Sequence, residues 1–128
     1  MIFPNKSFPH VVRASSVLTG SYVAGTVFSS DEHNTLGILV KYTKGDESYV
    51  EIKIESTIDA GTTYGQQTTE TVTAGVIEVD LATRRFDATG NYWVVVHPVK
   101  ADAFKISARA SGGTPTGTLA LDAQTSWT

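Results

Sequence analysis

The alternation of apolar and polar residues over residues 49–55 is the feature that most constrains the fold. Val50, Ile52 and Ile54 alternate there with charged residues. A period of two puts the three β-branched side chains on one face of a strand, whereas a helix would scatter them around its axis. Residues 36–42 repeat the alternation, and Gly45 and Asp46 supply turn residues between the two segments. The sequence therefore predicts an antiparallel hairpin.

Other segments have the same character: short, rich in β-branched or aromatic residues, and bounded by Gly, Pro, Asn, Asp or Ser. They cover residues 11–18, 21–28, 75–81, 91–99, 103–111 and 117–123. We therefore predict an all-β, single-domain antiparallel β-sandwich, jelly-roll-like, with about eight strands. The segment 91–99 contains YWVVV, which is apolar on both faces. It predicts either a central strand or a strand whose second face is covered by another subunit.

Two segments fall outside this pattern. Residues 1–12 place Phe3 and Phe8 among prolines and polar residues, which predicts an extended N-terminal arm that orders only when it is docked. Residues 13–128 then form the β-sandwich domain. Residues 59–74 are polar and without periodicity, so they predict an exposed loop that could make specific contacts with a protein or a glycan.

Composition and charge argue against several classes of protein. The chain of 128 residues has no Cys, so neither disulfides nor thiolate metal sites are expected. Residues 31–80 hold ten acidic residues against three basic ones, which argues against a partner made of nucleic acid. Neither a secretory signal nor an apolar run of about 18 residues is present, so we expect a soluble protein without a membrane partner.

The sequence offers no combination of residues that predicts catalysis or a cofactor. No nucleophile elbow is present, and Glu51, Lys53 and Glu55 alternate on the predicted outer face of a strand, so we interpret them as surface charges. Four consecutive potential ligands cannot all point at one metal ion, so a solvated turn is expected at Asp31, Glu32, His33 and Asn34. We predict a protein that is not an enzyme and has no catalytic, cofactor-binding or metal-binding residues.

Aromatic residues are the candidates for contacts with partners. Most lie within predicted strands and fit core or interface packing, although aromatic faces could also stack on sugars. The residues selected as candidate contacts between subunits or with partners are Phe3, Phe8, Tyr64, Trp93 and Trp127. The sugar-binding interpretation keeps a carbohydrate-binding β-sandwich module open as an alternative.

Two longer stretches resemble a known class of proteins. LGILVKYTKGDESYVEIKIEST, followed by YWVVVHPVKADAFKISARASGGTPTGTLAL, is similar to small virion structural proteins of tailed bacteriophages, over most of residues 14–127. The resemblance implies a β-sandwich that assembles with copies of itself and with other virion proteins on the phage particle. The implied role is a capsid decoration protein, or a head-to-tail or tail accessory subunit. One departure is TTYGQQ, where relatives have Trp or Phe, so that only Tyr64 could fill the place.

Overall fold

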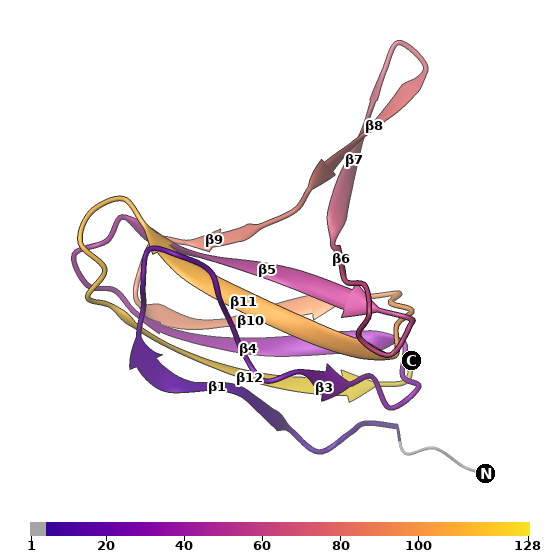
Figure 1. Ribbon diagram of the computed structural model, residues 1–128, viewed down its shortest axis with the longest axis horizontal. Helices are drawn as coiled ribbons and strands as arrows, with labels where there is room; N and C mark the ends of the chain where they lie inside the picture. The colour runs from indigo at the N-terminus through magenta and orange to yellow at the C-terminus, as the bar shows by residue number, and fades with distance from the viewer. Residues whose placement is uncertain (1–4) are drawn as a thin grey trace.

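The computed structural model describes residues 5–128, and within that range it is all β, with twelve strands and no helix (Figure 1). No helix in the described range is thus long and apolar enough to cross a membrane. The strands are β1 (His10–Val17), β2 (Val23–Ala24), β3 (Phe28–Ser29), β4 (Thr35–Thr43), β5 (Tyr49–Thr57), β6 (Gly65–Gln66), β7 (Thr68–Thr73), β8 (Val76–Leu81), β9 (Arg84–Phe86), β10 (Gly90–Val96), β11 (Ala103–Ser111) and β12 (Thr118–Ser126).

The strands form two packed antiparallel sheets and one separate hairpin. Sheet A has the order β1-β12-β4-β10. Sheet B has the order β2-β11-β5-β6, and in addition β3 pairs with β11 and β9 with β5. The third sheet is the pair β7-β8, which projects away from the sandwich (Figure 1). The predicted all-β antiparallel fold is confirmed, whereas its jelly-roll connections stay a prediction.

The core lies between the two sheets and is built from the inward faces that the alternation predicts. Val50 and Ile52 are completely buried, and Ile54 is almost so. Further buried residues come from the neighbouring strands: Leu36, Ile38, Val40, Tyr42, Phe104, Ile106, Leu119 and Leu121. Burial of such side chains is worth roughly 1.5–3 kcal/mol each, so this cluster is the main source of stability.

The segment 21–28 does not form the continuous strand that the sequence predicts. The chain instead makes two short strands, β2 and β3, which both pair with β11 of sheet B, and the segment between them, the crossing, is hydrogen-bonded to β11 and to β1 of sheet A. Gly25 N donates to Ile106 O at 2.9 Å, and Thr26 N donates to Val12 O at 2.8 Å. A Cβ at position 25 would lie 2.5 Å from Val12 O, so only glycine fits this crossing.

Residues 5–9 of the predicted arm lie against their own domain. Ser7 N donates to Thr125 O at 2.8 Å, and Ser7 Oγ accepts from Thr125 N at 3.0 Å. An isolated bridge joins Lys6 to Ser126, which extends the pairing of β1 with β12. These residues are therefore tied to the edge of sheet A by hydrogen bonds.

Candidate functional site

The hairpin β7-β8 corrects two predictions at once. Residues 59–74 are not a loop throughout, because they contain β6 and β7. Residues 75–81 do form a strand, but every residue of β8 is exposed and the strand lies outside the sandwich. Ala74 and Gly75 connect β7 to β8 with φ of 52° and 78°. Positive φ at both central residues is the signature of a type I′ turn, which favours a tight two-residue hairpin.

The register of the hairpin separates an apolar face from a polar face. Directly paired residues of antiparallel strands point to the same side. The pairs Thr68–Leu81, Glu70–Val79 and Val72–Ile77 therefore share one side. The other side carries the pairs Thr69–Asp80, Thr71–Glu78 and Thr73–Val76. We call the first side the apolar hairpin face, defined by Val72, Ile77, Val79 and Leu81.

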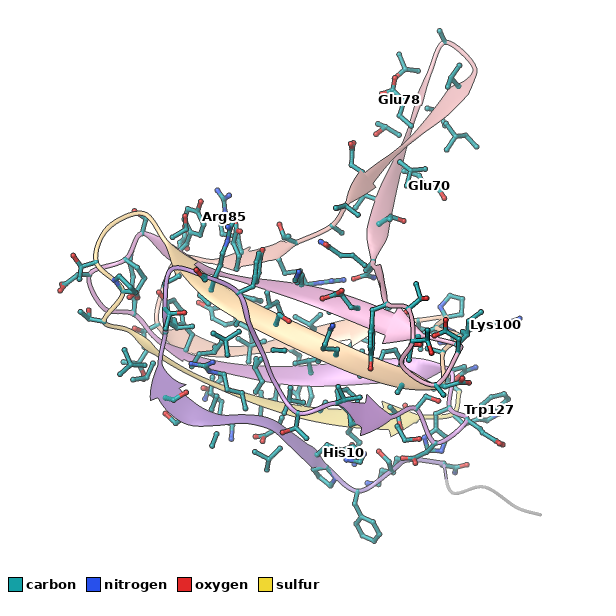
Figure 2. The ribbon with its side chains drawn as sticks, viewed as in Figure 1. His10, Glu70, Glu78, Arg85, Lys100 and Trp127 are labelled. Carbon is teal, nitrogen blue, oxygen red and sulfur yellow. The ribbon has the colours of Figure 1, made fainter. Side chains whose placement is uncertain are left out.

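The apolar hairpin face is open to solvent. Its four aliphatic side chains are 58–70% exposed, and the hairpin extends beyond both sheets (Figure 1). Figure 2 shows Glu70 and Glu78 on this projecting element, well away from the sandwich. A two-stranded hairpin with no third layer is only marginally stable in water. Contiguous exposed apolar surface of this kind marks interaction sites.

A second exposed apolar surface lies on the outer side of sheet A. Trp93 and Val95 of β10 point outward and are 67% and 62% exposed. Trp93 pairs with Leu39 of β4, and Val95 pairs with Gly37. Leu39 is half-buried, and Gly37 has no side chain to cover its backbone. We call Trp93, Val95 and Leu39 the β10 patch.

The β10 patch bears on the prediction for residues 91–99. β10 is not a central strand, because it ends the order of sheet A. Its inward side chain Val94 is buried, whereas Trp93 and Val95 face solvent. The other interpretation, that a second subunit covers the outer face, stays a prediction.

The aromatic candidates within residues 5–128 lie on more than one surface of the molecule. Phe3 lies outside the described residues. Phe8, just before β1, is 91% exposed. Trp127 follows β12, and its backbone N–H donates to Asn5 O at 2.6 Å. Tyr64 lies under the ammonium group of Lys105, which is 4.1 Å from its ring centre, on the sheet B side. Trp93 faces outward from sheet A, so Tyr64 and Trp93 belong to different sheets.

Glu51 is the charged residue whose predicted position is wrong. It is buried on the outer side of sheet B and not exposed. Arg85 Nη2 lies 2.9 Å from Oε1, and Arg109 Nη2 lies 2.9 Å from Oε2. Burial tends to raise the pKa of Glu51, but hydrogen bonds from Arg85, Arg109 and Tyr22 outweigh it and lower the pKa.

The two arginines that cover Glu51 are themselves stacked on aromatic rings. Arg85 lies over Tyr49 at 3.8 Å, and Arg109 lies over Tyr22 at 4.6 Å. The arginine head groups and the two rings therefore exclude water from the carboxylate. Lys53 and Glu55, its neighbours on the strand, are only partly covered.

Glu47 is a buried carboxylate that the sequence did not single out. Only 1% of its surface is exposed. Oε2 accepts from Tyr42 Oη and Gly45 N, both at 2.6 Å, and Oε1 accepts from the backbone N of Thr116 and Gly117 at 3.0 and 2.7 Å. Burial would raise the pKa of Glu47, but these hydrogen bonds outweigh it and lower the pKa to about 2. The carboxylate thus ties the β4-β5 turn to the β11-β12 turn.

The segment Asp31, Glu32, His33 and Asn34 does not gather into a metal site. Asp31 and Glu32 have φ of 54° and 60° and form an exposed turn. His33 points the other way, is buried, and has Nδ1 2.8 Å from Thr125 Oγ1. Among residues 5–128, no three His, Cys, Asp or Glu side chains are placed to hold one metal ion.

A groove of about 1190 Å³ lies between residues 6–10 and the loop after β3. It contains the pair His10 and Asp31, whose Nε2 and Oδ2 atoms are 3.8 Å apart. The two side chains are partly exposed as wholes, although the Nε2 atom of His10 is buried and makes no hydrogen bond, so the pair lacks the short hydrogen bond that links an acid to a base.

We compared the chain with known protein families, curated proteins and solved structures. The chain matches no protein-family model, no curated protein and no solved structure.

Proposed function

We propose that this protein is a non-enzymatic virion structural protein of a tailed bacteriophage, a capsid decoration or head-to-tail or tail accessory subunit. It acts by assembling with copies of itself and by binding other virion proteins on the particle. Part of the support is the pattern of strands and turns over most of residues 14–127, which resembles that of such proteins. The physical support is independent of that similarity and comes from the surface of the molecule.

The observation that carries the proposal is the apolar hairpin face. Its four aliphatic side chains are 58–70% exposed, although a soluble monomer gains nothing from leaving them in water. Covering their exposed fraction with a partner would contribute about 4–8 kcal/mol before the cost of association, from roughly 1.5–3 kcal/mol per side chain that is fully transferred from water. A surface of this kind is suited to assembly and not to chemistry on a small substrate.

The experiment is a measurement of mass in solution by size-exclusion chromatography with light scattering. The test variant replaces residues 68–81 with Asn-Gly. Ala82 N already donates to Gln67 O at 2.8 Å, so a two-residue turn closes the gap. We expect the intact protein to form a defined oligomer, and the shortened variant to have the mass of a single shortened subunit, which is below the 13.7 kDa of the intact one.

Particle binding provides the second arm of the test. An antiserum against the purified protein should label intact particles of the phage that encodes it. An intact protein that stays monomeric at all concentrations, and that is missing from the particle, would contradict the proposal. Retention of such a monomer on a glycan array, lost on Trp93→Ala, would favour the carbohydrate-binding module instead.

A further inference from the structure

We infer that the apolar hairpin face of one copy docks on the β10 patch of a second copy. This inference rests on the proposed self-assembly and names the two surfaces that meet. The donor is the face formed by Val72, Ile77, Val79 and Leu81. The acceptor is the outer side of sheet A at Trp93, Val95 and Leu39.

The two surfaces match in extent. Each hairpin strand has six residues, and β10 has seven. The donor offers a row of three aliphatic side chains on β8 together with Val72 of β7, and the acceptor offers side chains from the two adjacent strands β10 and β4. The ring of Trp93 lies over Gly37, with Cζ3 3.7 Å from where a Cβ of that glycine would stand, so ring and strand form one continuous apolar area that a row of smaller aliphatic side chains can cover.

The β10 edge also lacks the devices by which proteins protect free edges. Natural edge strands carry charges, prolines or bulges that discourage pairing with other chains. The sequence of β10, GNYWVVV, contains no charge and no proline, and its register with β4 runs without a bulge. An edge strand that is both unprotected and apolar on its outer face is expected to be covered in the assembled protein.

The hairpin cannot cover the β10 patch of its own copy. It leaves the sandwich at β6, on sheet B, and extends away from both sheets (Figure 1). The β10 patch lies on the outer side of sheet A, which is the opposite layer. A second copy is therefore needed to bring donor and acceptor together.

Pairing of two hairpins through their apolar faces is disfavoured by charge. Glu70 lies on the apolar hairpin face, between the pairs Thr68–Leu81 and Val72–Ile77. Two such faces packed together would place two carboxylates at the centre of the contact, where like charges cost most. The hairpin carries three acidic residues and no basic one, Glu70, Glu78 and Asp80.

The acceptor, in contrast, provides a cation next to the patch. Lys41 follows Leu39 on the same face of β4 and is paired in register with Asn91, beside Trp93. Its Nζ lies 2.6 Å from Asp122 Oδ2, yet the side chain is still 46% exposed and can also face Glu70 of a docked hairpin. Asp122, which pairs in register with Leu39, places an acid beside the same base. Charge therefore disfavours the pairing of two hairpin faces, whereas the choice of the β10 patch as acceptor rests on its apolar surface.

Docking of this kind is heterologous, because the two partners contribute different surfaces. Heterologous contacts produce rings when the rotation closes and open chains when it does not. Each copy then gives one hairpin and receives one, so no apolar hairpin face is left uncovered in a closed ring.

The experiment uses two disabled variants and their mixture. The donor variant is Ile77→Lys with Val79→Lys, and the acceptor variant is Trp93→Ala with Val95→Lys. All four positions are exposed, so the sandwich should fold, which far-UV circular dichroism and thermal unfolding would verify. The matched controls are Thr71→Lys, on the polar side of the same hairpin, and Ser15→Lys, on β1 at the opposite edge of sheet A.

Mass is measured by light scattering up to about 0.5 mM, since small interfaces bind in the micromolar to millimolar range. We expect the intact protein and both controls to form the same oligomer, and each disabled variant to be monomeric. The equimolar mixture should form a 1:1 dimer of twice the subunit mass, because one functional donor meets one functional acceptor.

Three results would overturn the inference. An acceptor variant with the same oligomeric mass as the intact protein would refute the acceptor and leave the proposed self-assembly standing. A mixture that stays monomeric would show that an intact apolar hairpin face does not bind an intact β10 patch. An intact protein that is monomeric up to the highest concentration would remove the proposed self-assembly as well as the docking.

Discussion

The substitution Glu47→Gln tests the most concentrated polar interaction in the structure. The carboxylate accepts four hydrogen bonds, two on each oxygen. A glutamine amide has one oxygen, and its NH₂ group would face donors wherever it points. In the less costly orientation the amide nitrogen replaces Oε2, and the Tyr42 hydroxyl rotates to accept from it. The N–H of Gly45 is then left without an acceptor.

Two independent estimates give the same loss of stability for Glu47→Gln. An unsatisfied buried N–H costs about 1–3 kcal/mol, and replacing charged by neutral acceptors weakens the remaining bonds, which together suggest about 3 kcal/mol. The pKa provides the second route. A pKa of about 2 in the folded protein, against 4.5 for an unperturbed glutamate, corresponds to about 3 kcal/mol of stability from ionised Glu47.

The assay is equilibrium unfolding in urea, monitored by tryptophan fluorescence, on the intact protein and the variant at pH 7. We expect the free energy of unfolding to fall by about 3 kcal/mol, a large part of the roughly 5–15 kcal/mol typical of a domain. The control is Glu55→Gln, because Glu55 is a partly covered acid whose Oε1 lies 3.5 Å from Lys53 Nζ. This substitution should change the free energy of unfolding by less than about 0.5 kcal/mol. A loss below about 1 kcal/mol for Glu47→Gln would refute the reasoning.

The same pair of proteins gives a test against pH. Because the folded-state pKa of Glu47 is lowered, its contribution is complete above about pH 5 and is lost as the pH falls toward about 2. The difference in stability between the intact protein and the Gln variant should therefore shrink between pH 5 and pH 2. A difference that stays constant over this interval would show that the ionised carboxylate is not the stabilising species.

Two further substitutions test the outer face of sheet B and the crossing between the sheets. Glu51→Ala should lower the free energy of unfolding in urea by about 1–3 kcal/mol, because Arg85 and Arg109 lose their shared partner. Arg109→Ala should have a smaller effect, because Arg85 still binds the carboxylate in that variant. A larger loss from Arg109→Ala than from Glu51→Ala would contradict this reasoning. Gly25→Ala should lower the melting temperature by at least about 5 °C, because the new Cβ would lie 2.5 Å from Val12 O. The control is Gly65→Ala, which should leave the melting temperature nearly unchanged because nothing lies within 4 Å of a Cβ at that position.

Much of the sandwich could be predicted because a period of two reports directly on burial. The inward faces of β4 and β5 follow from alternation alone, and the structure buries them as expected. Alternation does not indicate which residues cover the other face of a strand. Glu51 and Lys53 occupy equivalent outer positions in the pattern, yet only Glu51 is covered by arginines that arrive from β9 and β11. Glu47 gave no local signal, since two of its four donors come from a turn 69 and 70 residues away.

The hairpin shows the same difficulty in its clearest form. VIEVDL alternates as a sandwich strand would, and local pattern does not tell whether a strand joins the main sheet or leaves it. A signal for the hairpin was present in residues 68–75. Four threonines within TTETVT favour a strand, and Ala-Gly after them fits a two-residue turn. The segment before Val72 has few large apolar residues, and such a composition by itself is typical of a loop.

The base of the hairpin shows why its apolar residues point to assembly. Gln67 N donates to Ile54 O, and Ala82 N donates to Gln67 O, both at 2.8 Å, so the sandwich is closed below β7 and β8. None of the side chains beyond that base belongs to the hydrophobic core. The apolar hairpin face therefore adds nothing to the folding of its own domain, and in a monomer it would only promote aggregation. Its stabilising effect is available only when another surface covers it, and the β10 patch is the surface of this chain best suited to do so.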